Sequence, residues 1–187
     1  MRRVHPVETE SYRILRGMVD LSHLGPLSRA VAERVIHASA DLDYAEGLIF
    51  DEAALENGVS ALRRGGPVVT DVGMVAAGIT GRETLCFVSD ARTRTLSEQL
   101  STTRSAAGFR VAAEEVGKGA VWVVGNAPTA LFELLELEVA PSLVIGLPVG
   151  FVGPPNRKLR SWTAVCPPSR TVGRRVVPRS LRPHSTH

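Results

Sequence analysis

Apolar residues recur along the chain in two patterns, a helical periodicity and short unbroken runs, and the two alternate. The helical periodicity predicts helices over residues 7–19, over a segment that opens at Gly25-Pro26-Leu27 and includes His37, and over residues 51–64, 96–116 and 127–138. The short runs predict strands at Leu48–Phe50, Val68–Thr70, Leu85–Val88, Ala120–Val124 and Ser142–Gly146. Residues 71–79, which are rich in small side chains, are expected to form a short helix or a turn.

This alternation predicts an α/β fold, with a mostly parallel sheet and helices on both of its faces in a single domain. Continuous apolar strands are typical of parallel sheets that are buried on both faces, and 187 residues are enough for one such domain. Ligands bind at the carboxyl ends of the strands in these sheets. Small or polar residues follow the expected strands at 70–74, 89–92, 125–129 and 146–150, so a ligand site is expected there.

Local signals refine the expected helices. Asp51 can cap the helix over 51–64, and Gly65-Gly66-Pro67 ends it. Gly108 is expected to be the weak point of the helix over 96–116, because glycine is a poor helix former. Asn126 is expected to cap the helix that follows the strand at 120–124.

His37 is the strongest candidate for chemistry. It lies at the edge of the apolar side of its predicted helix, and the small residues 38–40 follow it. An imidazole with little bulk around it can meet a ligand, and histidine is the side chain best suited to proton transfer near neutral pH. From the residues alone, a partly buried histidine that bonds a backbone carbonyl is the more common reason for such a pattern.

Several classes of protein lack their signatures here. No Gly-x-Gly-x-x-Gly, Gly-x-x-x-x-Gly-Lys-Ser/Thr or Gly-x-Ser-x-Gly motif occurs, which argues against the usual nucleotide sites and the hydrolase elbow. Cys86 and Cys166 stand far apart without metal-ligand spacing, which argues against a zinc site and favours a reducing compartment. Because no apolar run has the length of a membrane span and no secretory signal is visible, we expect a cytoplasmic protein without a membrane partner.

The net charge of +3 hides an uneven distribution. Residues 151–187 hold eight Lys and Arg and no acidic residue, so residues 1–150 carry 14 basic against 19 acidic side chains. A basic tail can bind nucleic acid. The rest of the chain shows no matching basic surface with aromatic residues, so no nucleic-acid partner is expected.

Five sequence pieces occur in a distinctive order. They are Arg34-Val-Ile-His-Ala-Ser-Ala-Asp41, Asp71-Val-Gly-Met-Val-Ala-Ala-Gly-Ile79, Thr103-Arg-Ser-Ala-Ala107, Gly125-Asn-Ala-Pro-Thr-Ala-Leu-Phe-Glu-Leu-Leu135 and Gly146-Leu-Pro-Val-Gly-Phe-Val-Gly153. Together they resemble the precorrin-8X methylmutase family, also met as cobalt-precorrin-8 methylmutase, over residues 5 to about 153. The fourth and fifth pieces are long and unusual, so the resemblance is specific.

The resemblance implies an isomerase that moves a methyl group from ring carbon eleven to ring carbon twelve of a corrin precursor in cobalamin biosynthesis. It also implies a homodimer and no metal or redox cofactor from the protein. His37 matches the family's catalytic histidine, and a protonated ring position would make the conjugated system electron-poor enough for the methyl migration. His5 and His23 lie outside the matching pieces and are interpreted as surface or structural residues.

The tetrapyrrole implied as substrate is a flat, apolar macrocycle edged with carboxylates. Arg16 and Arg104 are the best candidates to bind these carboxylates in bidentate fashion, and Ser11 with Arg16 matches the family's spacing in the first helix. Asn126 can donate to the substrate in addition to its capping role. The remaining predicted substrate-binding residues, which would line the slot, are Thr129 and Met74, and a core role for Met74 is equally open.

The chain departs from the family pattern after Gly153. Residues 154–187 hold six prolines and eight basic residues, a composition that indicates either a genuine tail or a shifted reading frame. We therefore divide the chain into a methylmutase-like domain, residues 1–153, and an irregular basic tail, residues 154–187. Deleting this tail is expected to change stability little.

Two other functions are compatible with the residues. One is a corrinoid carrier without catalysis, left by the altered C-terminal part, and the other is a nucleic-acid adaptor with a basic tail. A corrin intermediate separates these functions from the isomerase. Conversion supports the isomerase, binding without conversion supports the carrier, and no binding supports neither. The motifs do not distinguish a cobalt-containing substrate from a cobalt-free one.

Overall fold

The computed structural model describes residues 5–147 and 163–166, and its centre is a five-stranded sheet in the order β1-β5-β4-β3-β2. The strands are β1 (Ile49–Phe50), β2 (Val68–Thr70), β3 (Val121–Val124), β4 (Leu143–Gly146) and β5 (Thr163–Cys166). The neighbours β2–β3, β3–β4 and β4–β5 pair in parallel, and β1 pairs antiparallel with β5. The expected α/β class with a mostly parallel sheet is confirmed.

Eight helices stand in the described part of the chain. They are α1 (Pro6–Met18), α2 (Pro26–Ser39), α3 (Tyr44–Gly47), α4 (Glu52–Arg63), α5 (Gly73–Gly78), α6 (Ala91–Gln99), α7 (Arg104–Val116) and α8 (Pro128–Glu136). As expected, Asp51 caps α4, and its side chain accepts a hydrogen bond from the Ala54 N–H. Within residues 5–147 and 163–166, no helix combines the length and apolar character that crossing a bilayer requires.

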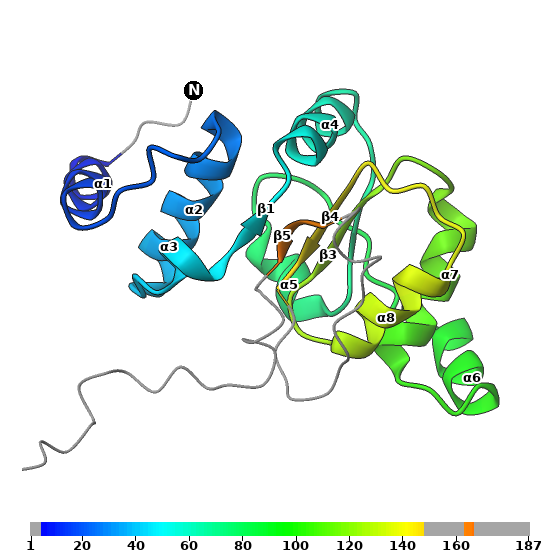
Figure 1. The fold of residues 1–187 in the computed structure, drawn as a ribbon. Coiled ribbons are helices and arrows are strands. Elements are labelled where there is room, and N and C mark those ends of the chain that lie inside the picture. Colours follow the sequence, from blue (N-terminus) through cyan, green and yellow to red (C-terminus); the bar gives the residue numbers. More distant parts are fainter. Residues whose placement is uncertain (1–4, 148–162, 167–187) are drawn as a thin grey trace, which may run out of the picture.

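Both faces of the sheet are buried, and alternate residues of each strand point to opposite faces. Trp122 and Val144 pack on one face with α7 and α8, where Phe109 meets Trp122 edge to face at 4.8 Å. The neighbouring residues Val121 and Leu143 pack on the other face, beneath α4. Figure 1 shows α7 and α8 together on one side of the sheet and α4 on the other.

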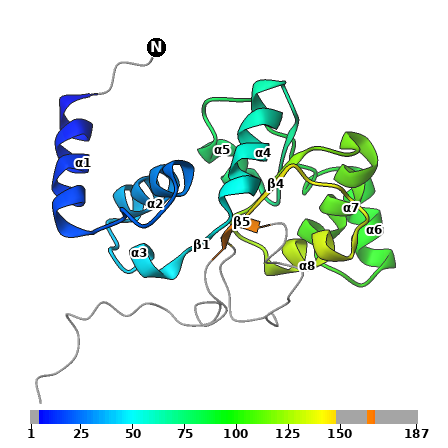
Figure 2. The same cartoon turned by 45° about the horizontal axis from the view of Figure 1, so that its top comes forward.

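The first two helices form a unit beside the sheet. A small core that includes Leu15 of α1 and Ile36 of α2 joins them, and Leu27 and Val31 of α2 pack toward α4. Figures 1 and 2 both show α1 on the outer side of α2, away from the sheet. α1 therefore depends on α2 for its packing, and α2 connects it to the rest of the domain.

The prediction of a strand at Leu85–Val88 is wrong, because only Leu85 of these four residues pairs with the sheet. Leu85 forms a single parallel bridge with Val69, and its N–H donates to the Val68 carbonyl at 2.8 Å. The chain then turns, because the Asp90 N–H donates to the Phe87 carbonyl. Phe87 packs against the core of α7 and α8, so this apolar run fills the core without pairing as a strand.

Residues 96–116 are mostly helical, as expected, but two helices, α6 and α7, share this region. The break lies at residues 100–103, where Ser101 adopts a φ of 50° and the Thr103 side chain caps α7 by accepting from the Ala106 N–H. Gly108 lies inside α7 and does not interrupt it. A Cβ at Gly108 would meet the backbone of Phe87 and Val88 at 3.4 Å, so the glycine permits close packing.

Residues 154–187 are expected to be mostly irregular, and Thr163–Cys166 depart from this expectation. These residues form β5, which lies between β4 and β1 and pairs with both. A threonine and a valine among the four residues suit a pleated strand, and the open edge of β4 provides hydrogen-bonding groups that need partners. The rest of the predicted tail lies outside the described residues.

This position of β5 reverses the expected effect of deleting the tail. A chain that ends at Gly153 loses the only strand that links β1 to the rest of the sheet within the described residues, and it leaves the edge of β4 unpaired. We expect its melting temperature to fall by roughly 5 °C or more, which corresponds to about 2 kcal/mol for a chain of this size. Thermal unfolding followed by circular dichroism measures this.

A chain that ends after Cys166 is the matched control, because it keeps every described strand. If the two truncated chains melt at the same temperature, β5 contributes nothing measurable to stability.

Candidate functional site

His37 lies in the last turn of α2, where Ala40 ends the helix in the left-handed region with a φ of 54°. Its Nδ1 lies 3.0 Å from the Ser11 Oγ of α1. The Tyr12 ring stacks on the imidazole, with ring centroids 4.7 Å apart and planes at 18°. Consecutive residues of α1 therefore hold the imidazole by its edge and by its face.

The Ser11 contact leaves the other ring nitrogen for chemistry. A hydroxyl can donate or accept, so Ser11 can bond either neutral tautomer of the imidazole. If Ser11 donates to Nδ1, Nε2 carries the proton, and if Ser11 accepts, Nε2 offers its lone pair. No hydrogen bond engages Nε2 of His37 among the described residues. The arrangement suits a proton donor and acceptor at Nε2.

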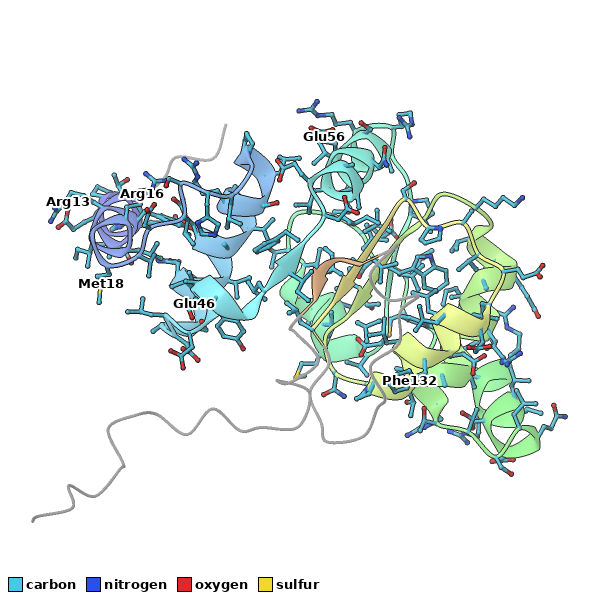
Figure 3. All side chains as sticks on the ribbon, in the orientation of Figure 1. Arg13, Arg16, Met18, Glu46, Glu56 and Phe132 are labelled. Carbon is cyan, nitrogen blue, oxygen red and sulfur yellow. The ribbon has the colours of Figure 1, made fainter. Side chains whose placement is uncertain are left out.

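Arg16 lies one turn further along α1 and forms a bidentate ion pair with Glu33 of α2. Its Nε and Nη2 donate to the two carboxylate oxygens at 2.8 and 2.7 Å. The hydrogen bond from Arg16 holds the pKa of the Glu33 carboxyl below its usual value, and the same pair raises the pKa of Arg16. Figure 3 shows Arg16 on the side of α1 that is nearer to α2, whereas Arg13 lies on the far side.

This ion pair changes the interpretation of Arg16. Two of its three guanidinium nitrogens bind Glu33, so a substrate carboxylate would meet mainly Nη1. Sequence reasoning proposed no role for Glu33 or for Tyr12. A role for Glu33 could have been predicted from its position four residues before His37 on one helix, since residues at this spacing share a face.

A second set of predicted residues gathers where β2 and β3 end. Asn126 follows β3, and Thr129 lies in the first turn of α8. The Thr129 hydroxyl lies 2.7 Å from the hydroxyl of Thr103, which places Thr129 beside the start of α7 and beside Arg104. Met74 stands on α5 and is 71% exposed, so the core role left open for it does not apply.

The expected cap at Asn126 is not observed. Ala127 occupies the N-cap position of α8, and no side chain caps this helix. Instead, the buried carboxylate of Asp71 accepts hydrogen bonds from the backbone N–H groups of Gly125, Asn126 and Ala127. Sequence reasoning placed Asp71 at a strand end and assigned it no role.

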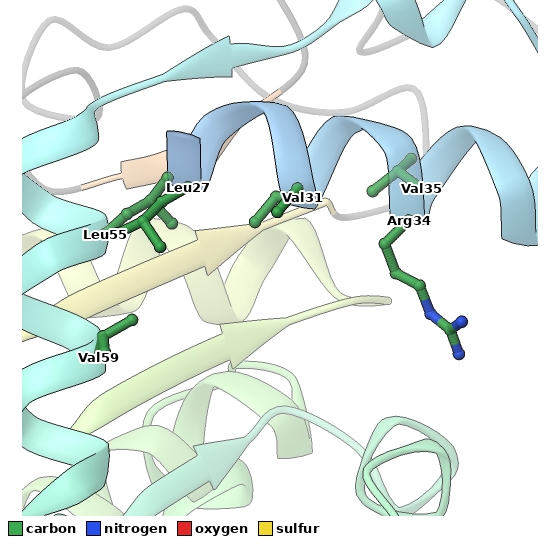
Figure 4. A pocket seen from close by; sticks show the side chains of 7 residues that line it. Leu27, Val31, Arg34, Val35, Leu55 and Val59 are labelled. Carbon is green, nitrogen blue, oxygen red and sulfur yellow. The ribbon is translucent and has the colours of Figure 1, made fainter. Parts of the chain in front are cut away.

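An apolar groove of about 350 Å³ separates α2 from α4. Figure 4 shows aliphatic side chains along the groove and the Arg34 guanidinium at one end. The residues that line it are Leu27, Ala30, Val31, Arg34, Val35, Leu55 and Val59. None of the predicted site residues is among them, although α2 contributes to the groove and carries His37. Arg34 also pairs with Glu8 of α1 at 3.0 Å.

The described residues thus hold two sets of candidate groups, Ser11, Arg16 and His37 at α1–α2, and Met74, Arg104, Asn126 and Thr129 at the strand ends. No hydrogen bond or ion pair joins the two sets in the part of the chain that the structure describes. In these same residues, no three His, Cys, Asp or Glu side chains are grouped so that they could hold a metal ion.

The sequence profile of the precorrin-8X methylmutase family matches residues 6–175, which is most of the chain. The chain belongs to this family. Cobalt-precorrin-8 methylmutase from Methanothermobacter thermautotrophicus is 37% identical over 160 residues, which cover 82% of this chain and 77% of that protein. The Salmonella typhimurium protein of the same name is 38% identical over 164 residues, covering 81% and 78%.

Solved structures agree with this membership. The precorrin-8X methylmutase from Thermus thermophilus superposes with a TM-score of 0.69 at 34% identity, covering 78% of this chain and 75% of that one. A precorrin-8X methylmutase related protein gives a TM-score of 0.68 at 29% identity, covering 75% and 78%. The methylmutase similarity extends beyond residue 153, where the sequence interpretation ended it, and it includes β5.

The Arg16–Glu33 pair predicts a pH dependence of stability in this methylmutase. Because the pKa of Glu33 is lower in the folded state, the pair stabilises the fold above the ordinary carboxyl pKa of 4.5, and this stabilisation is lost as the pH falls through the lower, folded value. At pH 7 we expect Glu33→Gln to lose about 1 kcal/mol. Below pH 4.5 the difference from the wild type should narrow, as measured by urea unfolding.

Glu10→Gln is the control, because the Glu10–Arg13 pair has similar geometry but is exposed on both sides. Its effect should be small at every pH. A constant difference between wild type and Glu33→Gln from pH 7 to pH 3 would contradict the assignment.

Proposed function

We propose that this chain moves a methyl group between adjacent ring carbons, eleven to twelve, of precorrin-8X or its cobalt form, with His37 as the group that transfers the proton. As a precorrin-8X methylmutase, the chain is an isomerase of cobalamin biosynthesis. The observation that supports the role of His37 is its setting, with Nδ1 against Ser11 and the ring face against Tyr12.

The proposed reaction is an isomerisation in which no atoms are gained or lost. One carbon–carbon bond to the methyl group breaks and another forms at the adjacent ring carbon. A proton placed on the ring withdraws electrons from the conjugated system and so favours the migration, and the same proton leaves afterwards. His37 can supply and recover it through Nε2, because an imidazole serves as donor and acceptor within the same cycle.

The fixed orientation of the imidazole favours this use. Proton transfer needs the donor within hydrogen-bond reach of the reacting atom, and a freely rotating ring would seldom point correctly. The stacked Tyr12 ring restricts rotation of the imidazole plane, and Ser11 fixes which edge faces α1. Arg16 in turn lies over the Tyr12 ring, with its guanidinium carbon 5.9 Å from the ring centroid, and its bond to Glu33 holds it there.

Carboxylates at the edge of the macrocycle need cationic partners, and Arg104 is the proposed one at the strand ends. Arg104 opens α7 and is exposed. No ion pair engages it within the described residues, in contrast to Arg16. The neighbouring polar groups of Thr129 and Asn126 would add hydrogen-bond donors on the same side of the sheet.

We also propose a homodimer, which the family resemblance implies. α1 supports it, because Val7, Ile14 and Met18 lie along one face of this helix and are 70%, 50% and 60% exposed. Large apolar side chains in one row on an outer helix are typical of a contact surface. The cytoplasmic location stays a prediction from the sequence.

Light scattering tests the dimer, with an expected mass of twice 20.0 kDa. Ile14→Lys should shift it toward the monomer, and Arg13→Glu, on the same exposed helix outside that row, is the control. A monomeric wild type at micromolar concentration would refute the dimer.

The His37→Ala variant should lose isomerisation and retain binding of the corrin product, because the imidazole handles the proton and does not anchor carboxylates. General acid–base catalysis is worth roughly 100- to 10,000-fold in rate, so the rate of conversion should fall at least about 100-fold. Absorption spectra follow conversion, and spectral titration gives product affinity. The exposed His23 supplies the control, His23→Ala, which should convert normally.

Arg104→Ala should give the opposite result in the same assays. Loss of a uniform carboxylate contact weakens binding more than it slows the bound step, so affinity falls while turnover at saturation changes little. Full turnover in His37→Ala, or unchanged affinity in Arg104→Ala, would remove the respective assignment. A wild-type chain that binds the corrin without converting it would favour the carrier.

A further inference from the structure

Asp71 is a buried acidic side chain that the proposed reaction does not use. It follows β2 directly and is only 1% exposed. Its backbone N–H donates to the Val123 carbonyl at 3.2 Å, so the pairing of β2 with β3 continues to this residue and fixes its position. A buried carboxylate is costly to the fold unless hydrogen bonds compensate for its lost hydration. The partners of Asp71 therefore indicate its role.

All hydrogen bonds to the Asp71 carboxylate within the described residues come from one short backbone segment. Oδ1 accepts from the Gly125 N–H at 3.2 Å. Oδ2 accepts from the N–H groups of Asn126 at 2.9 Å and Ala127 at 2.7 Å. Both oxygens act only as acceptors, which is the behaviour of an ionised carboxylate.

This segment, residues 125–127, links the end of β3 to the start of α8 and has few other means of fixing itself. The N-cap residue Ala127 has no polar side chain, and Pro128 has no N–H to donate. The turn is half-buried, so its three successive N–H groups need acceptors that the solvent supplies only in part. Asp71 supplies them from the neighbouring strand, which makes the carboxylate the main polar anchor of the turn.

A second contact joins the same two strand ends. Gly125 lies so close to α5 that an added Cβ would be 2.7 Å from the Val75 Cγ2. The segment after β3 is thus held by the carboxylate of Asp71 and by close packing against Val75, which lies four residues after Asp71 in the chain. The hydrogen bonds to Asp71 and the packing against Val75 are possible only when residues 125–127 occupy the position observed here.

Several proposed substrate-binding groups depend on that position. Asn126 belongs to the held segment, and Thr129 begins the helix that the segment leads into. The hydroxyl contact of Thr129 with Thr103 extends the chain of contacts to the cap of α7, where Arg104 is the first helical residue. Met74 follows Asp71 by three residues on α5.

We propose that Asp71 is a positioning residue of the substrate site, where its carboxylate fixes residues 125–127 and through them Asn126, Thr129 and Arg104. This inference rests on the proposed function for the identity of the ligand. The contact between Asp71 and the 125–127 segment can be tested without a ligand.

Asp71→Asn tests the proposal with little change in side-chain size. In either orientation of the amide, its NH2 group faces at least one of the three backbone N–H donors, so at least one hydrogen bond is replaced by a donor–donor contact. Amide exchange at residues 125–127 should become at least tenfold faster. Affinity for the corrin product should fall about 10- to 100-fold, which is the cost of losing one or two hydrogen bonds between the displaced groups and the ligand. Turnover at saturation should change less, because His37 lies on α2.

Leu143→Ala is the matched control, since Leu143 is 5% exposed in the adjacent strand β4 and packs on the opposite face of the sheet, beneath α4. It should lower the melting temperature and leave both exchange at 125–127 and product affinity near wild type. An equal loss of affinity in Leu143→Ala would reduce the role of Asp71 to general stability. Unchanged exchange, or faster exchange with unchanged affinity, in Asp71→Asn would overturn the proposal.

A second route displaces the same segment while Asp71 stays intact. Gly125→Ala should lose affinity as Asp71→Asn does, and Val75→Ala in the same chain should restore it by opening the space that the new Cβ needs. This pair decides the question if Asp71→Asn does not fold, and failure of Val75→Ala to restore affinity would count against the proposal. If the wild type binds no corrin, the proposed function fails, whereas normal binding by Asp71→Asn overturns only the role of Asp71.

Discussion

Burial of the sheet on both faces is the constraint on which the rest of this structure depends. The strands are short and almost wholly apolar, so each needs helices above and below it, and α4 on one face with α7 and α8 on the other provide them. The same burial forces polar residues to the strand ends, where Asp71 and Asn126 lie. It also leaves α1 outside the main layers, packed against α2 on the side away from the sheet.

Two carboxylates organise the candidate site without being proposed to react. Glu33 holds Arg16, and Arg16 lies over the Tyr12 ring that stacks on His37. Asp71 holds the turn that precedes α8. In both cases the two oxygens of a buried carboxylate accept N–H hydrogen bonds, two at Glu33 and three at Asp71, and hydrogen bonds to a carboxylate are stronger than those between neutral groups. The imidazole proposed to react and the proposed substrate contacts therefore rest on separate supports.

The separation of the two supports has a functional consequence. His37 belongs to the α1–α2 unit, whereas the proposed carboxylate ligand Arg104 belongs to the sheet and its helices. A change at the strand ends, where substrate binding is proposed, can thus leave the proposed proton-transfer group intact. A change in α1 can likewise disturb His37 and leave the proposed binding residues in place. This independence is why the affinity of the site and its turnover at saturation are expected to respond to different residues.

The sequence by itself determined the fold class and most element boundaries, because hydrophobic periodicity, the caps at Asp51 and Gly65-Gly66-Pro67, and family motifs are local signals. The same local motifs indicated His37 as the candidate for proton transfer, which stays a prediction. Tertiary structure decided what depends on contacts between distant segments. Phe87 of the apolar run Leu85–Val88 packs against the core of α7 and α8, and Gly108 permits a close contact without breaking α7. Residues 163–166 join the sheet because β4 and β1 offer them partners. The pairing of Arg16 with Glu33, and of Asp71 with the turn at 125–127, joins residues 17 or more than 50 positions apart. No local pattern contains such pairs, since the folded backbone alone brings them within hydrogen-bond distance.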